Sequence, residues 1–267
     1  MNVGFIGAGN MATAMIRGIR SHGFSSEEVF AFDIDSQKLQ NLQESVGIQI
    51  AQDARSLIVS SDVVVLAVKP QMLGEALQSL PECFEQQDPL IISIAAGTPL
   101  LKLEQLCGKG SRIIRVMPNL NATVGEAMSA YCGNEAVQSK DFEIAATILE
   151  SFGKAVMLEE EKFAAYSALA GCSPAYTMLY MDALAKAGEQ YGISRDVALK
   201  VVAQAVLGTA KLLDASGEET DVWIKRVCSP GGTTIEGIRS LENNDVRQLI
   251  IEAAEASIHR DEELQKG

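Results

Sequence analysis

Short apolar runs alternate with amphipathic stretches through the first half of the chain. The runs are rich in β-branched residues and predict buried parallel strands; they span Asn2–Ile6, Val29–Phe32, Asp62–Val68, Leu90–Ile94 and Arg112–Met117. The stretches between them have a helical period and include Met11–Ser21, Ser36–Ser45, Met72–Leu80 and Leu100–Leu106. This alternation predicts a doubly wound α/β domain with a mostly parallel sheet. Weaker strand patterns occur at Gly125–Tyr131 and Ala155–Leu158.

The pattern changes after about Glu159, where longer segments with a helical period replace the alternation. These segments are Phe163–Leu169, Pro174–Tyr191, Arg195–Ala215 and Asp245–Leu264, with shorter ones at Asp221–Arg226 and Thr234–Leu241. We therefore expect an α/β domain over residues 1–159 and an all-α domain over residues 160–267.

Two of the predicted helices, Pro174–Tyr191 and Arg195–Ala215, are apolar on most of their circumference. An outer helix of a small domain buries only one stripe, so this much apolar surface needs a further partner. We favour burial between two copies of the chain, because large apolar patches mark such interfaces. The alternative is a compact helical core within a monomer.

The charge of the chain narrows the choice of partners. Of its 267 residues, 47% are hydrophobic and 21% are charged, which is typical of a folded globular protein. The 22 Lys and Arg residues face 35 Asp and Glu residues, giving a formal net charge of -13. Such a charge disfavours binding to nucleic acid or to an anionic membrane surface. A helix N-terminus can still bind an anionic cofactor.

The cysteines indicate free thiols. Five cysteines, at positions 83, 107, 132, 172 and 228, are widely spaced and form no C-x-x-C pair. This spacing predicts no metal site and favours a reducing cytoplasm. The first residues carry no basic segment or cleavage site of a secretory signal, and no apolar run approaches the ~18 residues of a membrane span. We therefore expect a cytoplasmic protein.

A glycine-rich turn directly follows the first predicted strand. Its residues, Gly7-Ala8-Gly9-Asn10-Met11-Ala12, have the G-x-G-x-x-A spacing and open the next predicted helix. Gly7 would permit a tight turn, Gly9 would let the backbone approach a pyrophosphate, and Ala12 would let the helix pack closely on the strand. This context favours a dinucleotide site over a simple chain reversal.

Asp33 is the candidate that selects the cofactor. It follows the strand Val29–Phe32, at the position where a carboxylate accepts the ribose hydroxyls and disfavours a 2′-phosphate. This favours NADH at least as much as NADPH. NADPH stays open because Lys38 could reach a 2′-phosphate, and Asp33 or Asp35 could instead only cap the following helix.

Two further segments end predicted strands on the expected cofactor side of the sheet. Ala67-Val68-Lys69-Pro70 stands at the end of the third run and places Lys69 to meet phosphate or ribose, although a solvated surface lysine is the alternative. Ala95-Ala96-Gly97 follows the fourth run, where small residues would let a nicotinamide ring lie against the backbone. Small residues also occur in simple turns.

A second motif lies between two predicted helices of the C-terminal half. The segment Cys228-Ser229-Pro230-Gly231-Gly232-Thr233-Thr234 offers hydroxyls and free backbone N–H groups at the positive end of a helix. Such a segment is suited to bind a carboxylate, but it could equally be a capped loop. A second segment, Ala170-Gly171-Cys172-Ser173-Pro174-Ala175-Tyr176, stands at the start of the long helix. The two segments together are more specific than a generic capped loop.

Together these segments resemble those of the pyrroline-5-carboxylate reductases, the enzymes of the last step of proline biosynthesis. The resemblance extends over the whole chain and includes Gly4-Phe5-Ile6, Ser93-Ile94 and Arg115-Val116-Met117-Pro118-Asn119; its most specific part is Cys228–Glu236. Two departures occur. Cys172 stands in a segment that often reads Ser-Gly-Ser-Ser in the family, and Arg226 stands where some members have an Asn near the nicotinamide.

The resemblance implies an N-terminal Rossmann domain and a C-terminal helical domain that interlocks with a second subunit, with larger rings of dimers in such families. It implies a substrate site at the dimer interface. There Ser229, Gly232, Thr233 and Thr234 would hold the substrate, with Glu160 near the pyrroline ring. The cofactor, NADPH or NADH, would bind at Gly7–Ala12, Asp33, Ala67–Pro70 and Ala95–Gly97.

The implied reaction is hydride transfer to the cyclic imine of 1-pyrroline-5-carboxylate, which gives L-proline. We expect the segment Ser229–Thr234 to fix the carboxylate and the Thr234 hydroxyl to hydrogen-bond the ring nitrogen. A protonated imine is already a strong electrophile, so no strong general acid is needed. The histidines of the chain agree with this expectation, because His22 and His259 lie on predicted helix faces away from the motifs.

Two other functions are weighed against this one. A β-hydroxyacid dehydrogenase also joins a dinucleotide domain to helices, but it needs a base, typically a lysine on the first long helix of the second domain. The stretch Gly171–Asp182 contains no lysine, which disfavours that function. A nonenzymatic dinucleotide-sensing module would need no second segment suited to bind a substrate, so Ser229–Thr234 argues against it. A measurement of turnover decides between the two.

Overall fold

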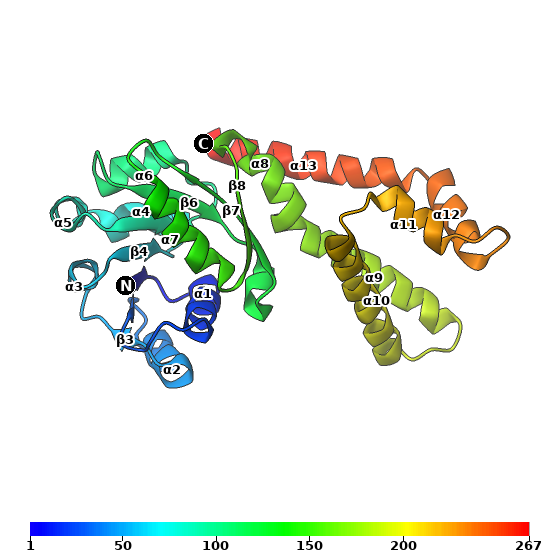
Figure 1. Cartoon of the computed structure of the whole chain (residues 1–267), viewed down its shortest axis with the longest axis horizontal. Coiled ribbons are helices and arrows are strands. Elements are labelled where there is room, and N and C mark those ends of the chain that lie inside the picture. The colour runs from blue at the N-terminus through cyan, green and yellow to red at the C-terminus, as the bar shows by residue number, and fades with distance from the viewer. Residues whose placement is uncertain (267) are drawn as a thin grey trace. The chain divides into compact units, whose positions relative to one another are not determined.

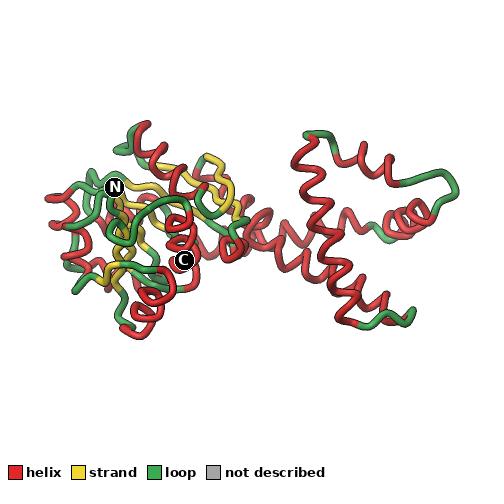
Figure 2. The backbone as a smooth tube through the Cα atoms, turned by 60° about the horizontal axis from the view of Figure 1, so that its bottom comes forward, coloured by secondary structure: helices red, strands yellow, loops and turns green. Residues whose placement is uncertain are grey.

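The computed structural model describes residues 1–266, which form two compact units. The first comprises Met1–Gly171 together with residues 258–266, and the second comprises Cys172–Ser257. Residue 267, the last of the predicted 160–267 domain, lies outside the described residues. The first unit extends beyond the boundary predicted at 159/160, because Phe163 and Tyr166 pack against Ala130 and Cys132 of the sheet. Figures 1 and 2 show strands in the first unit and helices throughout the second.

Within residues 1–266 the strands join into one eight-stranded sheet with the order β3-β2-β1-β4-β5-β6-β7-β8. Neighbouring strands run parallel except β6 and β7, which are antiparallel. The strands are β1 Val3–Ile6, β2 Val29–Phe32, β3 Gln49–Ile50, β4 Val63–Leu66, β5 Leu90–Ser93, β6 Ile113–Met117, β7 Ala127–Gly133 and β8 Gly153–Met157. The predicted mostly parallel sheet is confirmed, including the two weaker strands.

Helices cover both faces of this sheet. One face carries α1 Asn10–Ser21, α2 Ser36–Val46 and α7 Ser139–Glu150; the other carries α3 Ala54–Val59, α4 Pro70–Leu77, α5 Pro81–Gln87 and α6 Leu100–Cys107. In β4, Val63 and Val65 belong to one core, whereas Val64 and Leu66 belong to the other. A strand buried on both faces needs apolar residues at every position, which explains the unbroken apolar runs in the sequence.

Several elements of the first unit carry little signal in the sequence. β3 has two residues, α3 has six and α5 has seven, which is too short to show a period. Local chemistry still defines them. Asp53 caps α3 by accepting from the Ser56 N–H at 2.7 Å, and the Ser56 side chain returns the contact in a capping box.

Residues 160–266 are mostly helical, and those from Cys172 to Ser257 form the second unit, whereas Phe163–Tyr166 and the end of the last helix belong to the first. α8 Phe163–Tyr166 continues through a π-helical turn, Ser167–Cys172, into α9 Ser173–Gln190. The helices that follow are α10 Arg195–Ser216, α11 Thr220–Val227, α12 Thr233–Asn243 and α13 Val246–Lys266. The predicted all-α half is therefore confirmed. None of the helices in the described residues combines the length and the apolar character that a membrane crossing requires.

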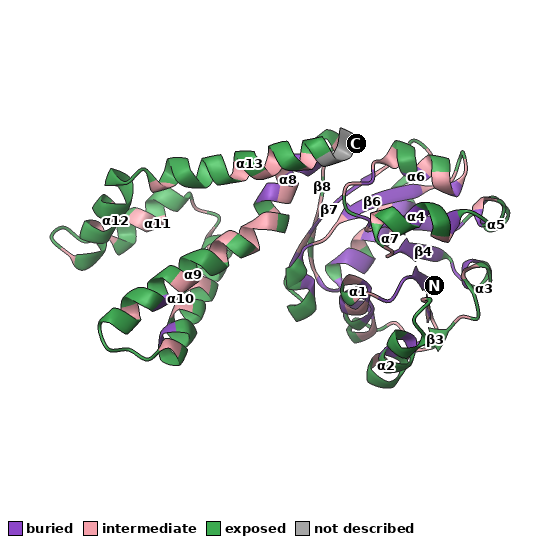
Figure 3. Ribbon diagram, turned by 180° about the vertical axis from the view of Figure 1, so that it is seen from behind, coloured by how far each residue is buried: buried purple, intermediate pink, exposed green. Residues whose placement is uncertain are grey.

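The second unit has almost no core of its own (Figure 3). Among residues 172–257, all of which are described, the buried side chains are Ala185 and Ala198. By contrast, Met178, Leu179 and Val201 are 65%, 71% and 62% exposed. The alternative of a compact helical core within a monomer is therefore wrong, and the apolar helices require another surface to cover them.

The packing of α1 gives a test of the first unit. A Cβ at Gly18 would lie 2.7 Å from the Cβ of Phe152 and 2.9 Å from the carbonyl oxygen of Ser151. Gly18→Ala gains up to about 1 kcal/mol in helix propensity, but overpacking typically costs about 1–3 kcal/mol. We expect a net loss of stability in urea unfolding, because backbone and Cβ atoms cannot rotate away.

Gly74→Ala is the matched control, because Gly74 lies inside α4 and a Cβ there would meet nothing within 4 Å. This variant should be neutral or slightly more stable than the wild type. A Gly18→Ala protein as stable as Gly74→Ala would contradict the packing described here.

Candidate active site

The glycine-rich turn joins β1 to α1, and its two glycines meet different constraints. Gly7 has a φ of 104°, a conformation that favours glycine, and a Cβ there would lie 2.7 Å from the carbonyl oxygen of Ala67. Gly9 is the extended N-cap of α1, and a Cβ on it would meet no atom within 4 Å in the described structure. The fold itself therefore requires Gly7, whereas the space beside Gly9 is open to a ligand.

A cavity of about 300 Å³ lies beside this turn, at the carboxyl ends of β1, β2 and β4. β1 stands between β2 and β4, so the strand order reverses here, and open α/β sheets bind ligands at such a reversal. The cavity brings together six of the predicted cofactor residues: Gly7, Gly9, Asp33, Ala67, Val68 and Lys69. The others lie outside its lining: Ala8 and Ala12, which are buried, and Asn10, Met11, Pro70, Ala95, Ala96 and Gly97.

Asp33 is held against the glycine-rich turn. Its Oδ2 accepts a hydrogen bond from the Ala8 N–H at 2.7 Å, and its Oδ1 accepts from the Asp35 N–H at 2.9 Å. The cap of α2 is Asp35, which accepts from the N–H groups of Gln37 and Lys38. The capping alternative therefore applies to Asp35 and not to Asp33. Lys38 Nζ lies 3.5 Å from Asp35 Oδ2.

The segments after β4 and β5 stand at the same edge of the sheet, because these strands are neighbours. Lys69 lines the cavity and is the N-cap of α4, with Pro70 at the first helical position, where proline fits the helix geometry. Ala95 is buried, and Gly97 has a φ of 68°. Both predicted segments thus follow the carboxyl ends of neighbouring parallel strands.

The segment Ser229–Thr234 lies in the second unit, between α11 and α12. The Gly232 N–H donates to the Ser229 carbonyl at 3.0 Å, and a Cβ on Gly232 would lie 2.4 Å from Ser229 Oγ. Gly232 is the N-cap of α12 and has no side chain to cap it. The first N–H groups of a helix have no acceptor within the helix, so those of Thr233 and Thr234 are available to an anion.

Glu160 lies in the first unit, at the start of the 3-10 helix Glu160–Lys162. Its Oε1 accepts hydrogen bonds from Arg115 Nη1 at 2.7 Å and from the Leu100 N–H at 2.8 Å. The guanidinium carbon of Arg115 lies 4.6 Å from the centre of the Phe163 ring. Sequence reasoning gave Arg115 no role of its own. The sequence feature that could have pointed to Arg115 is a charged residue inside the otherwise apolar run Ile113–Met117.

Arg226, the departure noted near the nicotinamide position, is engaged within the second unit. Both of its terminal nitrogens donate to the Glu218 carboxylate, Nη2 at 2.7 Å, and its guanidinium lies 4.6 Å from the centre of the Trp223 ring. These hydrogen bonds raise the pKa of Arg226, so it stays charged.

The two histidines and the buried Cys107 and Cys132 lie outside the predicted site segments. Burial raises the pKa of the Cys107 and Cys132 thiols to about 12, so neither is a thiolate at neutral pH. His22 Nδ1 lies 3.0 Å from the Gly18 carbonyl oxygen at the end of α1, and His259 lies on α13. Within the described residues, no group of three His, Cys, Asp or Glu side chains could hold a metal ion.

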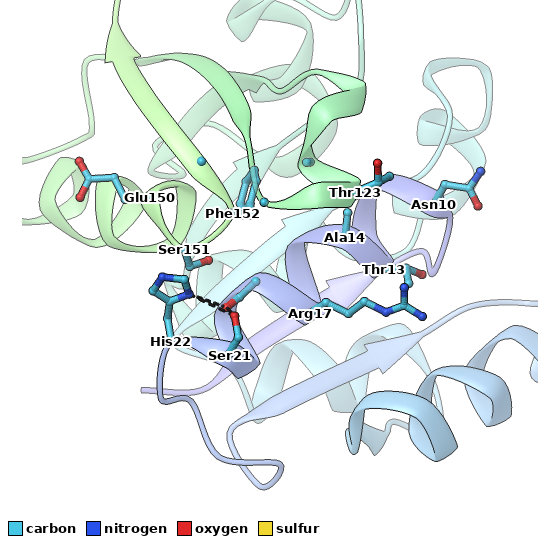
Figure 4. Close-up of a pocket in the computed structure, with 14 residues that line it drawn as sticks. Asn10, Thr13, Ala14, Arg17, Ser21, His22, Thr123, Glu150, Ser151 and Phe152 are labelled. Carbon is cyan, nitrogen blue, oxygen red and sulfur yellow. Dashed lines mark hydrogen bonds between the residues drawn. The ribbon is translucent and has the colours of Figure 1, made fainter. Parts of the chain in front are cut away.

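A larger cavity of about 650 Å³ lies along α1 (Figure 4). It is lined by Thr13 and Arg17 of α1, by the C-cap residue His22 and by Phe152. Of the predicted site residues it contains Asn10 alone, and neither Asp33 nor the glycines of the turn contribute to it. The smaller cavity is therefore the candidate cofactor site, since it carries the groups suited to a dinucleotide.

Two family models match separate parts of the chain. Residues 160–264 match the family model described as pyrroline-5-carboxylate reductase dimerisation. Residues 2–97 match the model described as NADP oxidoreductase coenzyme F420-dependent.

Relatives named pyrroline-5-carboxylate reductase match nearly the whole chain. The pyrroline-5-carboxylate reductase of Methanosarcina acetivorans is 37% identical over 99% of this chain and 98% of its own length. A solved pyrroline-5-carboxylate reductase from Coxiella burnetii is 33% identical, with a TM-score of 0.94 and 98% of both chains covered. The pyrroline carboxylate reductase of Plasmodium falciparum, solved with NADP bound, is 28% identical, with a TM-score of 0.87 and 99% and 98% of the two chains covered. The chain therefore belongs to the pyrroline-5-carboxylate reductase family of oxidoreductases.

Proposed function

We propose that this protein reduces 1-pyrroline-5-carboxylate to L-proline with NADH or NADPH. One observation carries the proposal. The chain has a glycine-rich turn beside a cavity lined by Gly9 and Asp33, and it also has a helix start at Gly232–Thr234 without a side-chain cap. The first feature suits a dinucleotide and the second suits a small carboxylate. The family relationship over the full chain supports the same reaction.

The residues at the cavity fit the cofactor. Gly9 leaves open space at the N-terminus of α1, where backbone N–H groups would hold the pyrophosphate. Asp33 would accept the ribose hydroxyls, and Lys69 would approach phosphate or ribose from the end of β4. We propose that Ala95–Gly97 face the nicotinamide. When bound, the cofactor supplies the hydride.

The segment Ser229–Thr234 would hold the substrate. The N–H groups at the start of α12 and the hydroxyls of Ser229 and Thr233 would bind the carboxylate. The Thr234 hydroxyl oxygen would accept a hydrogen bond from the protonated ring nitrogen and so keep the proton on that atom. Because the ring is already cationic, the protein needs chiefly to position it and exclude water.

We also propose a homodimer that interlocks through residues 160–267, with the substrate site at the subunit interface and further assembly into rings. The exposed apolar helices of the second unit support it. A cytoplasmic location is supported by the five free cysteines of the described chain.

The reaction is tested by following NADH and NADPH oxidation with and without pyrroline-5-carboxylate. Thr234→Ala should lower kcat/KM by roughly a hundredfold, the typical cost of removing one well-placed hydrogen-bonding group. Thr209→Ala is the control, since the Thr209 hydroxyl donates to Ala205 within α10, and it should retain activity. No substrate-dependent oxidation by the folded wild type would reject the function, and an unimpaired Thr234→Ala would reject the role of Thr234.

The structure supports a preference for NADH at least equal to that for NADPH. The Asp33 carboxylate lines the cavity, and Lys38 is paired with Asp35. A like-charge contact at ~4 Å costs about 1–4 kcal/mol in a partly solvated site. Asp33→Asn should therefore shift the NADH to NADPH ratio of kcat/KM toward NADPH by at least about fivefold.

Glu44→Gln is the matched control, because it removes a carboxylate charge from an exposed position of α2 that does not line the cavity. Its ratio should change less than that of Asp33→Asn. A wild-type KM for NADPH far below that for NADH would overturn the assignment of Asp33.

The dimer is tested by light scattering. The wild type should have an even multiple of the mass of one chain, which is twice that mass for a dimer and more for a ring of dimers. Leu179→Glu should lower that mass at micromolar concentration, because Leu179 is 71% exposed in the single chain and a buried charge in an interface is costly. Gln190→Glu adds the same charge at an exposed polar position of α9 and should leave the mass unchanged. A monomeric wild type would exclude the interlocked dimer.

A further inference from the structure

We propose that Arg115 is a positioning residue for the cofactor, acting through Glu160 on residues 94–99, which join β5 to α6. The proposal rests on the proposed function, since residues 95–97 are where the nicotinamide is proposed to lie. The argument has three steps: the burial of Arg115, the capping of α6 by Glu160, and the anchoring of the segment between them.

Arg115 is a buried cation in the middle of the sheet. It belongs to β6, stands in register with Ser93 of β5 and Cys132 of β7, and is 3% exposed. Its charge is compensated by Glu160 and by the face of the Phe163 ring. An apolar residue would serve strand packing equally well. The arginine therefore has a use that packing alone does not explain.

Glu160 caps a helix that lacks a cap of its own. Pro99 is the N-cap of α6, and its side chain makes no capping hydrogen bond. The Leu100 N–H, at the first position of α6, instead donates to Glu160 Oε1 at 2.8 Å, across a separation of 60 residues. A carboxylate is favourable at this positive end of a helix. Arg115 binds the same oxygen, so it determines where the cap stands.

This contact anchors the far end of the segment proposed to face the nicotinamide. The near end is anchored to the sheet, because the Ile94 N–H donates to the Leu66 carbonyl at 3.1 Å. Between the two anchors the Thr98 N–H donates to the Ala95 carbonyl at 3.3 Å, and Gly97 adopts a φ of 68°. Without the Arg115 contact, the Glu160 side chain, which is 30% exposed, would be free to turn toward solvent. The start of α6 and residues 95–97 would then no longer be held in a fixed position relative to the sheet.

The positioning role differs from a direct substrate contact by Glu160 in what it requires. A direct contact with the cationic ring needs the negative charge of Glu160. The positioning role needs an acceptor oxygen at the Oε1 position, which glutamine also has. Displacement of a binding group by about 1 Å costs up to about a hundredfold, so the two roles give separable changes in cofactor and substrate binding.

The experiment measures the Kd of NADH by nicotinamide fluorescence, without substrate, and the KM of pyrroline-5-carboxylate. Glu160→Ala and Arg115→Met should each weaken NADH binding by about tenfold or more. The double variant should be no weaker than the worse single variant, because both act on the same contact. Glu160→Gln should bind NADH within about twofold of the wild type, since its amide oxygen can accept from both donors.

Arg112→Met is the matched control. Arg112 immediately precedes β6 at its amino end and pairs with Asp141 and Asp88, so its loss removes an arginine ion pair without touching residues 94–99. This variant should bind NADH as the wild type does, even if its thermal stability falls. If Arg115→Met does not fold, the Glu160 variants carry the test, because Glu160 is partly exposed.

Two results would overturn the positioning role. One is an unchanged NADH Kd in Glu160→Ala. The other is a folded Arg115→Met protein that binds NADH as tightly as the wild type, which would show that Glu160 holds its position without Arg115. A wild type that binds NADH but does not reduce pyrroline-5-carboxylate would reject the proposed function and leave the effect of Arg115 on NADH binding measurable.

Discussion

The close approach of β1 and β4 at Gly7 is the constraint on which the candidate cofactor site depends. The Gly7 N–H donates to the Phe32 carbonyl at 2.8 Å, and the Ala67 N–H donates to the Ile6 carbonyl at 2.8 Å. These bonds join the ends of β2, β1 and β4 at one point. Only a glycine can stand there, because a Cβ would enter the Ala67 carbonyl. Asp33 and Lys69 follow directly from the joined strands and therefore line the same cavity.

Local backbone chemistry lets an acidic chain offer a site for an anion. The formal net charge of -13 is spread over the surface and screened by salt within about 10 Å. At the cavity the relevant groups are the N-terminus of α1 and the side chain of Lys69. Asp33 works in the opposite direction, since it is held by the Ala8 N–H and presents negative charge to the ribose end. In the proposed binding mode, cofactor choice would thus depend on a few neighbouring groups and not on net charge.

The two units solve the problem of burial differently. In the first, both faces of the sheet are covered by helices of the same chain, and the strand residues are fully buried. In the second, Ala185 and Ala198 are the buried side chains of residues 172–257. Helices that are apolar around most of their circumference cannot bury all of their apolar side chains against one another in a single layer. These helices therefore need a further surface to cover them, which the proposed dimer would supply.

The sequence by itself determined the class of fold, most strands and helices, and the residue types of both motifs. It could do so because a doubly buried strand and an apolar helix leave direct periodic patterns, and because the glycine-rich turn is a local structure. It did not decide between Asp33 and Asp35 as the cap of α2, and it gave no role to Arg115.

Those points were decided by tertiary structure, since each depends on a contact between residues far apart in the chain. Asp33 is distinguished from Asp35 by its hydrogen bond to Ala8, 25 positions away. Arg115 meets Glu160 across 45 positions, and Glu160 meets Leu100 across 60. Such pairings leave no period in the sequence, because they arise only where the sheet brings the ends of separate elements together.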